Sequence, residues 1–232
     1  MPQKIDRKRK ASSPYSAVMT REQFLFHETR ITAKLLDEGL SKDEIVKEII
    51  SKNLFQYPTE KSVLQMVRTC LRRLEALSDK ALITAIAAES SDVARQICLY
   101  AMMRQYRLVW DFMITVIGEK YRRLDDSFSK MELHVFFLRL QEQDAWVAEW
   151  SDNTIAKLRQ VFTKILVENG YLNSVRAEKL NPVLLSPILE HAIRESGQEI
   201  VLPASPSSLP TRTGSGSCTV FINAPSHPQY HR

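Results

Sequence analysis

Four hydrogen-bond donors lie on one side of the segment Trp150–Leu172 when this segment is drawn as an α-helix. Asn153, Lys157, Gln160 and Lys164 stand at positions i, i+4, i+7 and i+11, a spacing that gives a single helical face. Asparagine and glutamine amides can bond adenine edges, and lysine contacts phosphate or guanine. Because no acidic residue belongs to this set, the face has the chemistry of a DNA contact. An ordinary solvated face of a core helix has the same spacing.

A second helical segment earlier in the chain carries the same arrangement of donors. Lys61, Gln65, Arg68 and Arg72 occupy the same offsets, and this segment also follows a shorter helical run and a polar turn. The sequence therefore predicts two helix-turn-helix or winged-helix-like units, one in each half. Helical geometry dictates these offsets for any one face, so the repeat does not by itself separate a binding face from a solvated one.

The elements that position the later face can be read from its flanks. Ser151 or Asp152 is predicted to cap the helix start, and Gly170 to provide a left-handed exit. The buried side is predicted to hold Ile155, Leu158, Val161, Phe162, Ile165 and Leu166. Beyond the glycine, residues 171–182 are long enough for a small β-hairpin, the wing of a winged helix. This wing would bring Arg176 and Lys179 to the DNA.

The rest of the chain is predicted to be helical, which makes the fold class all-α. Glycines are few and alternating β-branched patterns are almost absent. Ser41 and Glu44 form a predicted capping box. Helices are expected over 20–36, 43–52, 60–77, 79–88, 92–105, 107–123, 130–140, 145–150 and 183–195, where Pro187 would kink or delay the last one.

Charge and composition divide the chain into four parts. The net charge is +5. Residues 1–19 hold five basic side chains, including Arg7–Lys10, against one acid, and residues 196–232 hold two against one, so the region between is neutral. We expect 1–19 to be a disordered basic tail and 196–232 a mostly disordered Ser/Pro/Gly-rich tail. Between them we expect helical subdomains at 20–89 and 90–195. The basic tail would either add phosphate contacts or act as a solubilising segment.

No catalytic, metal or cofactor motif is evident. A phosphate-binding glycine loop, a nucleophile elbow and a paired-carboxylate nuclease pattern are all absent from the sequence. The histidines and cysteines lack metal-ligand spacing: His27, His134, His191, His227, His231, Cys70, Cys98 and Cys218. We therefore expect a protein that is not an enzyme and uses no small-molecule substrate. No apolar run approaches the ~18 residues of a membrane span and no signal peptide is recognisable, so we expect a soluble cytoplasmic protein without membrane contact.

Motifs in both halves resemble one known family. The motif A-x-x-R-x-Y falls at Ala101, Arg104 and Tyr106, and Asp111-Phe112 follow it. W-S-x-x-T-x-x-K-x-R then falls at Trp150, Ser151, Thr154, Lys157 and Arg159, followed by Leu166, Gly170 and Leu172, and N-L-F-x-x-x-T-E spans Asn53–Glu60. Over about residues 22–195 the chain resembles the BrxA family, the small helical component of bacteriophage-exclusion (BREX) defence systems.

The resemblance implies a non-enzymatic helical protein that binds double-stranded DNA and supports phage restriction beside larger methyltransferase and ATPase subunits. From the neutral body we expect DNA affinity that is modest and mostly independent of sequence. The alternative is a scaffold that docks other BREX subunits through exposed tryptophans, for which Trp110, Trp146 and Trp150 are the candidates. The C-terminal tail departs from the family pattern.

Overall fold

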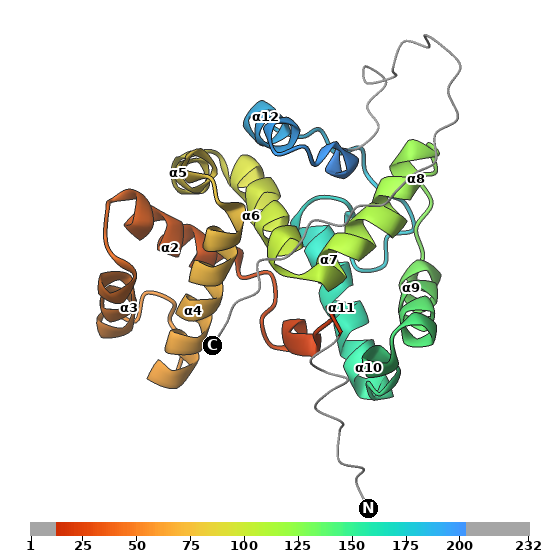
Figure 1. The fold of residues 1–232 in the computed structure, drawn as a ribbon, viewed down its shortest axis with the longest axis horizontal. Helices are drawn as coiled ribbons and strands as arrows, with labels where there is room; N and C mark the ends of the chain where they lie inside the picture. The colour runs from red at the N-terminus through yellow and green to blue at the C-terminus, as the bar shows by residue number, and fades with distance from the viewer. Residues whose placement is uncertain (1–12, 203–232) are drawn as a thin grey trace, which may run out of the picture.

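The computed structural model describes residues 13–202, and helices joined by loops make up this part of the chain (Figure 1). The prediction of an all-α fold is confirmed: the only β-pairing within 13–202 is one isolated bridge between Ser127 and Lys179. The elements are η1 (Ala17–Thr20), α2 (Phe26–Asp37), α3 (Lys42–Ser51), α4 (Glu60–Leu77), α5 (Lys80–Ala88), α6 (Ser91–Gln105), α7 (Arg107–Phe112), η2 (Met113–Gly118), α8 (Glu119–Arg122), α9 (Lys130–Gln143), α10 (Ala145–Ala148), α11 (Asp152–Glu168), α12 (Pro187–Glu195) and η3 (Glu199–Val201).

The helix boundaries follow the local signals that the sequence carries. Ser41 and Glu44 form the predicted capping box at α3, and the Ser151 hydroxyl accepts from the amide of Thr154 at the start of α11. Gly39 and Gly170 take φ angles of +90° and +75°, conformations that favour glycine, where the chain leaves α2 and α11. α12 begins only at Pro187, because Ser186 caps it and the proline occupies the first turn.

The predicted helix over 20–36 is wrong at its start. After the single turn of η1 the chain stays irregular until α2 begins at Phe26, and Leu25 adopts a left-handed φ of +55°. The reason is Arg73 on α4, whose guanidinium binds the carbonyl oxygens of residues 22–24, so these oxygens are drawn out of a helical ladder. We call residues 13–25 the strap.

The predicted helix over 107–123 is continuous in path but changes its winding. Met113–Gly118 (η2) form a π-helical stretch between α7 and α8. The Thr115 hydroxyl donates to the carbonyl of Asp111 at 2.7 Å, so a side chain enters the ladder where the winding changes. The wider turn shifts which side chains of this segment face the core, and sequence periodicity does not reveal such a shift.

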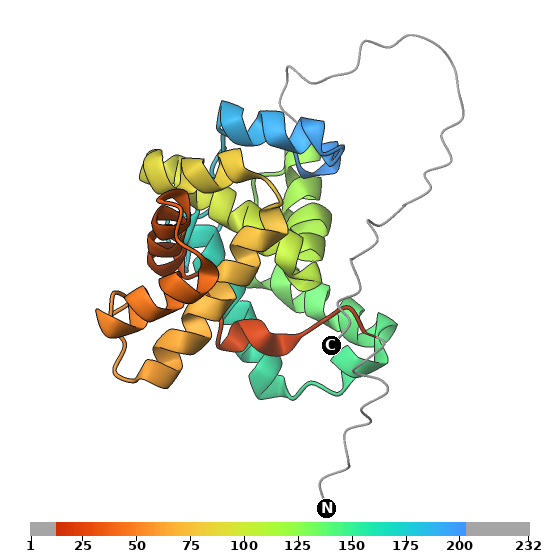
Figure 2. The ribbon, with the colours of Figure 1, turned by 60° about the vertical axis from the view of Figure 1, so that its left-hand side comes forward.

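α11 lies in the largest hydrophobic cluster of the described chain. Its six predicted core residues are all buried. Phe162 packs edge-on against Phe112 of α7 and Phe137 of α9, with ring centroids 4.7 and 5.8 Å apart. A smaller cluster joins α3 to α4 around Ile49 and Val67. Figure 2 shows α2–α4 on one side and α12 across the top. The predicted boundary between two helical subdomains, at residues 89 and 90, stays a prediction.

Arg73 of α4 contacts both the strap and Tyr106, which lies between α6 and α7. Its side chain is 1% exposed, and its Nη atoms donate to the carbonyls of Phe24, Glu22 and Gln23 at 2.6–2.7 Å. The Tyr106 hydroxyl donates to the Glu22 carboxylate at 2.7 Å and accepts from Arg73 Nε at 3.4 Å. Burial, partly offset by the Arg73 charge, raises the pKa of Tyr106, so its hydroxyl stays protonated and able to donate.

Removing the Arg73 side chain is therefore expected to destabilise the fold strongly. Arg73→Ala leaves three buried carbonyls and the Tyr106 hydroxyl without the guanidinium that bonds them, and we expect a loss of about 3–5 kcal/mol in the free energy of unfolding. Arg68→Ala, an exposed change on the same helix, should stay within about 0.5 kcal/mol. Urea unfolding followed by circular dichroism measures both; equal stabilities would contradict the role given to Arg73.

Candidate nucleic-acid interface

The four donors predicted on α11 lie together on its solvent side. Asn153, Lys157, Gln160 and Lys164 are all exposed, and within residues 13–202 none has a hydrogen bond or an ion pair with another side chain. Their polar atoms are therefore available to a ligand. We call these four residues the α11 face; that they contact DNA stays a prediction.

Acidic residues flank the α11 face without interrupting it. Asp152 lies in the first helical turn, and Glu168 lies one turn beyond Lys164. Burial raises the pKa of Glu168, and the nearby charges of Lys164 and Arg95 lower it less. Between these two acids α11 itself has no acidic residue, which suits a polyanion over about three turns of helix.

The predicted hairpin over 171–182 does not form. The segment instead folds as a loop, with the Asn181 side chain donating to the carbonyl of Gly170 at 2.8 Å. Residues 178–180 pair with the segment before α9: the Phe128 N–H donates to the backbone carbonyl of Glu178 at 2.9 Å, and the Leu180 N–H donates to the backbone carbonyl of Asp126 at 2.7 Å. We call residues 171–180 the wing loop; its residues 178–180 pair with residues 126–128, about 50 positions earlier in the sequence.

The two predicted contacts on the wing loop differ in their surroundings. Arg176 is exposed, and its side chain has no partner within the described residues. Lys179 is also exposed, but its Nζ lies 3.4 Å from the Asp126 carboxylate. Such a solvent-exposed pair contributes little stability and can exchange for a phosphate, although Asp126 adds a negative charge beside it.

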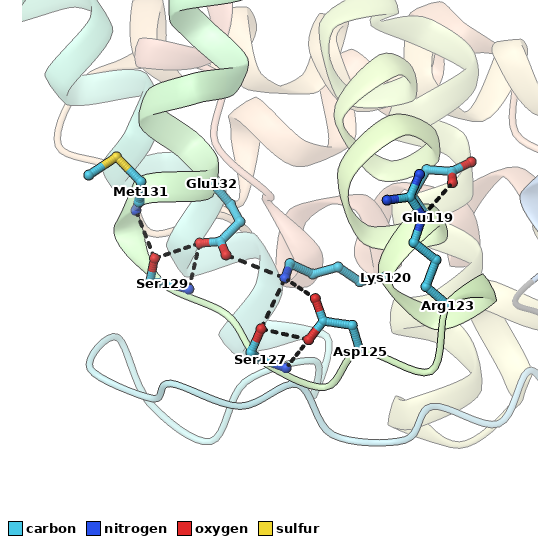
Figure 3. A network of polar contacts seen from close by, with 8 residues as sticks. All are labelled: Glu119, Lys120, Arg123, Asp125, Ser127, Ser129, Met131 and Glu132. Atoms are coloured by element: carbon cyan, nitrogen blue, oxygen red, sulfur yellow. Dashed lines mark hydrogen bonds and ion pairs between the residues drawn. The ribbon is translucent and has the colours of Figure 1, made fainter.

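A polar network around Lys120 fixes the turn that pairs with the wing loop (Figure 3). Lys120 Nζ lies 2.8 Å from Asp125, 3.2 Å from the Ser127 hydroxyl and 3.3 Å from Glu132. The ammonium has three hydrogens, so these oxygens use its donors. The Ser127 and Ser129 hydroxyls donate in turn to Asp125 and Glu132. The network holds α8 against the start of α9 and leaves Lys120 no donor for an anion.

The α4 residues form a second exposed set. Lys61, Gln65, Arg68 and Arg72, the α4 face, are all exposed and line one surface hollow with Glu22 and Glu75. Both acids are paired with cations: Arg72 lies 3.1 Å from Glu22, and Lys42 lies 2.6 Å from Glu75. Lys61, Gln65 and Arg68 have no partner within the described chain, so the hollow keeps unpaired positive charge.

Sequence reasoning missed the strap that connects these surfaces. Residues 13–19 were predicted to belong to the disordered basic tail and residues 20–25 to begin a helix, whereas the structure places the strap between α4 and α11, as Figure 1 shows. Its turn η1 packs on α11, and Arg73 of α4 holds residues 22–24. The available signal was Arg73 itself: it stands three residues after the buried Cys70 and four before the buried Leu77, on the apolar side of α4.

The tryptophan anchors of the scaffold hypothesis are not freely exposed. Trp150 is 8% exposed, and Trp110 and Trp146 are half-buried against the main hydrophobic cluster. Exposed large apolar side chains in the described chain are aliphatic instead, with Leu124 and Leu184 the most exposed. Docking of a partner through a tryptophan hot spot therefore has no support from these positions.

Groups that could do other chemistry are few in the described chain. Residues 13–202 contain no cluster of three or more histidine, cysteine or acidic side chains able to hold a metal ion. Cys70 and Cys98 are buried, and this burial raises the pKa of Cys70 to about 11 and that of Cys98 to about 12, so neither thiol is activated. No helix among these residues is both long and apolar enough to cross a bilayer.

Comparisons with known proteins agree on one family. The family model described as BrxA matches residues 13–197, a region that includes the strap. A "BREX protein BrxA" of Bacillus cereus (strain H3081.97) is 32% identical over 190 residues, covering 81% of this chain and 94% of that protein. Another of the same name, from Paramagnetospirillum magneticum, is 25% identical over 75% of this chain and 87% of its own. The crystal structure of an uncharacterized protein from Magnetospirillum magneticum has a TM-score of 0.68 and 26% identity, covering 82% of this chain and 96% of that one.

The exposed and buried sides of α11 should respond oppositely to mutation. Replacing Lys157 and Lys164 together by alanine is expected to change the free energy of unfolding by no more than about 0.5 kcal/mol, because both side chains are exposed and unpaired. Leu158→Ala, at a fully buried position of the same helix, should cost about 2–5 kcal/mol. Chemical denaturation tests this; a large loss in the lysine variant would mean that these side chains are structural.

The Lys120 network predicts two carboxyl groups that titrate at low pH. Hydrogen bonds from Lys120 and Ser127 lower the pKa of Asp125; for Glu132, partial burial raises the pKa, but bonds from Ser129 and Lys120 lower it on balance. Because both pKa values are lower in the folded state, this stabilisation is present above the ordinary carboxyl pKa and is lost as the pH falls through the folded value.

Lys120→Met should raise both pKa values toward the ordinary ~3.9 and ~4.3, as measured by carboxyl-carbon NMR titration. Lys120, Asp125 and Glu132 line a surface hollow together with the exposed Arg139, which has no ion pair within the described residues. Arg139→Ala should therefore leave both pKa values unchanged. An unaltered Asp125 titration in the Lys120 variant would refute this account of the turn.

Proposed function

Because this chain belongs to the BrxA family, we propose that it is a component of a BREX system that binds double-stranded DNA and performs no catalytic step itself. The observation that carries the proposal is the α11 face: four exposed donors in one row, none of which has a hydrogen bond or ion pair with an acidic side chain within the described residues. Lysine supplies sequence-independent attraction to phosphates, and the Asn153 and Gln160 amides supply donors and acceptors for base edges.

The order of elements around α11 supports this assignment. In a winged-helix domain, a short strand before the second helix pairs with the wing that follows the recognition helix. Here residues 126–128 precede α9, α11 follows, and residues 178–180 of the wing loop pair back onto 126–128. We assign α11 as the recognition helix and the wing loop as a reduced wing, with Arg176 as its contact to the DNA backbone.

The α4 face would contribute in a less base-specific way. The connection between α3 and α4 spans residues 52–59, longer than the three or four residues of a helix-turn-helix turn. α4 is therefore assigned to gripping the phosphate backbone through Lys61, Arg68 and Arg72, with Gln65 as an added donor. Arg72 would exchange or share its contact with Glu22 when a phosphate approaches.

The charge distribution bears on the affinity for DNA, and the family bears on the partners. With a body of no net charge, affinity is expected to be modest, strongly dependent on salt and mostly independent of sequence. Such a protein is suited to hold DNA for larger BREX subunits that carry out the chemistry, and it would act in the cytoplasm, where that DNA lies. No metal or cofactor is assigned.

Duplex binding at several salt concentrations tests the proposal. If Lys157 and Lys164 contact phosphates, their double alanine variant should bind with a slope of log affinity against log salt that is shallower by about 2. Gln160→Ala should change affinity little but alter any preference among sequences if α11 enters the major groove. Fluorescence anisotropy with a labelled duplex of about two helical turns measures both.

The basic residues before the strap need a separate control. A chain beginning at Ser13 removes Lys4 and Arg7–Lys10 but keeps Tyr15, whose hydroxyl donates to Asp111 at 2.8 Å, and the buried Met19. The proposal requires this shortened chain to bind duplex DNA. Loss of all binding on shortening, with normal binding by the double-lysine variant, would place the DNA contact in residues 1–12 and reject the role of α11.

A further inference from the structure

The strap presents one unpaired cation between the two proposed DNA-binding faces. Arg21 is exposed and has no side-chain partner within the described residues, whereas the adjacent Glu22, the only acid of the strap, is 4% exposed. Glu22 is neutralised by Arg72 at 3.1 Å and by the Tyr106 hydroxyl at 2.7 Å. The strap thus keeps its negative charge inside and leaves its positive charge in solvent.

Contacts on both sides fix where Arg21 lies. On one side η1, which Arg21 directly follows, packs against α11. On the other side Glu22 forms part of the wall of the hollow along the α4 face, and Arg73 of α4 binds the next three carbonyls. Arg21 therefore occupies the junction of the α11 and α4 surfaces, as the position of the strap between these helices in Figures 1 and 2 illustrates.

The backbone at this junction is held before any ligand arrives. Three hydrogen bonds of 2.6–2.7 Å to Arg73 fix residues 22–24, and the Arg21 N–H bonds the carbonyl of Val18 at 3.0 Å. A contact residue on a fixed backbone loses less conformational entropy on binding than one on a free segment. Such pre-organisation distinguishes Arg21 from an exposed arginine on a loose loop.

From these observations we infer that the strap is a third DNA-contacting element, in which Arg21 binds a phosphate and joins the α4 and α11 faces into one site for a single duplex. The inference rests on the proposed function and extends it. It assigns a residue outside both helices, and it fixes the stoichiometry at one duplex per chain, whereas two independent faces would hold two. Arg73, Glu22 and Tyr106 act as positioning residues for this contact and do not touch the DNA.

The test compares Arg21→Ala with Lys80→Ala in duplex-binding titrations at several salt concentrations. Both positions are exposed cations without a side-chain partner in the described chain, but Lys80 begins α5, which is not part of the proposed site. Arg21→Ala should make the salt slope shallower by about one, whereas Lys80→Ala should leave it unchanged and Arg21→Lys should restore it. Circular dichroism confirms that each variant is folded.

Stoichiometry supplies the second readout. The wild-type chain beginning at Ser13 should saturate with one duplex of about 20 base pairs, and the Lys61/Arg68 and Lys157/Lys164 double alanine variants should each weaken that same binding event. Binding of two short duplexes per chain, or equal slopes for Arg21→Ala and Lys80→Ala, would overturn the inference while leaving the proposed function intact. Failure of the wild type to bind any duplex at low salt would reject the proposed function and the inference with it.

Discussion

The buried guanidinium of Arg73 is the constraint on which the arrangement of this molecule depends. A charged side chain removed from water needs oxygen acceptors, and Arg73 takes three of them from the carbonyls of residues 22–24. Those carbonyls are then unable to build a helix, so the strap stays irregular until Leu25 turns left-handed into α2. One charge on α4 thereby decides the course of a segment that reaches α11.

The ammonium of Lys120, like the guanidinium of Arg73, is surrounded by oxygen acceptors. In both networks a cation binds oxygens of a segment without regular secondary structure. Arg73 binds the strap, which lies beside the α4 and α11 faces. Lys120 binds the turn before α9, which pairs with the wing loop. Arg73 is buried, so its contacts are not screened by solvent. Lys120 and its carboxylate partners lie nearer to solvent, where screening weakens each contact. The two cations thus position the surfaces that we assign to DNA without belonging to them.

Sequence periodicity correctly predicted the features that depend on residues within a single helix. The apolar side of α11, its Ser151 cap, its Gly170 exit and the exposure of its donors all follow from spacing within one helix. The strap could not be predicted in this way, because its partner Arg73 lies about 50 residues along the chain. The hairpin prediction failed for the same reason, since residues 178–180 find their partner at 126–128 rather than next to them. The π-helical stretch adds a shift of register that no periodic pattern encodes.

We propose that exposed lysines on α4 and α11, rather than the basic N-terminal residues, hold DNA. Acetylation of lysines with and without saturating duplex, read residue by residue by mass spectrometry, tests this on the full-length chain. If the two helices hold DNA, Lys61, Lys157 and Lys164 should lose reactivity together when duplex is added, while Lys80 and Lys34 should keep theirs. Unchanged reactivity of the three helix lysines, with protection confined to Lys4, Lys8 and Lys10, would contradict it.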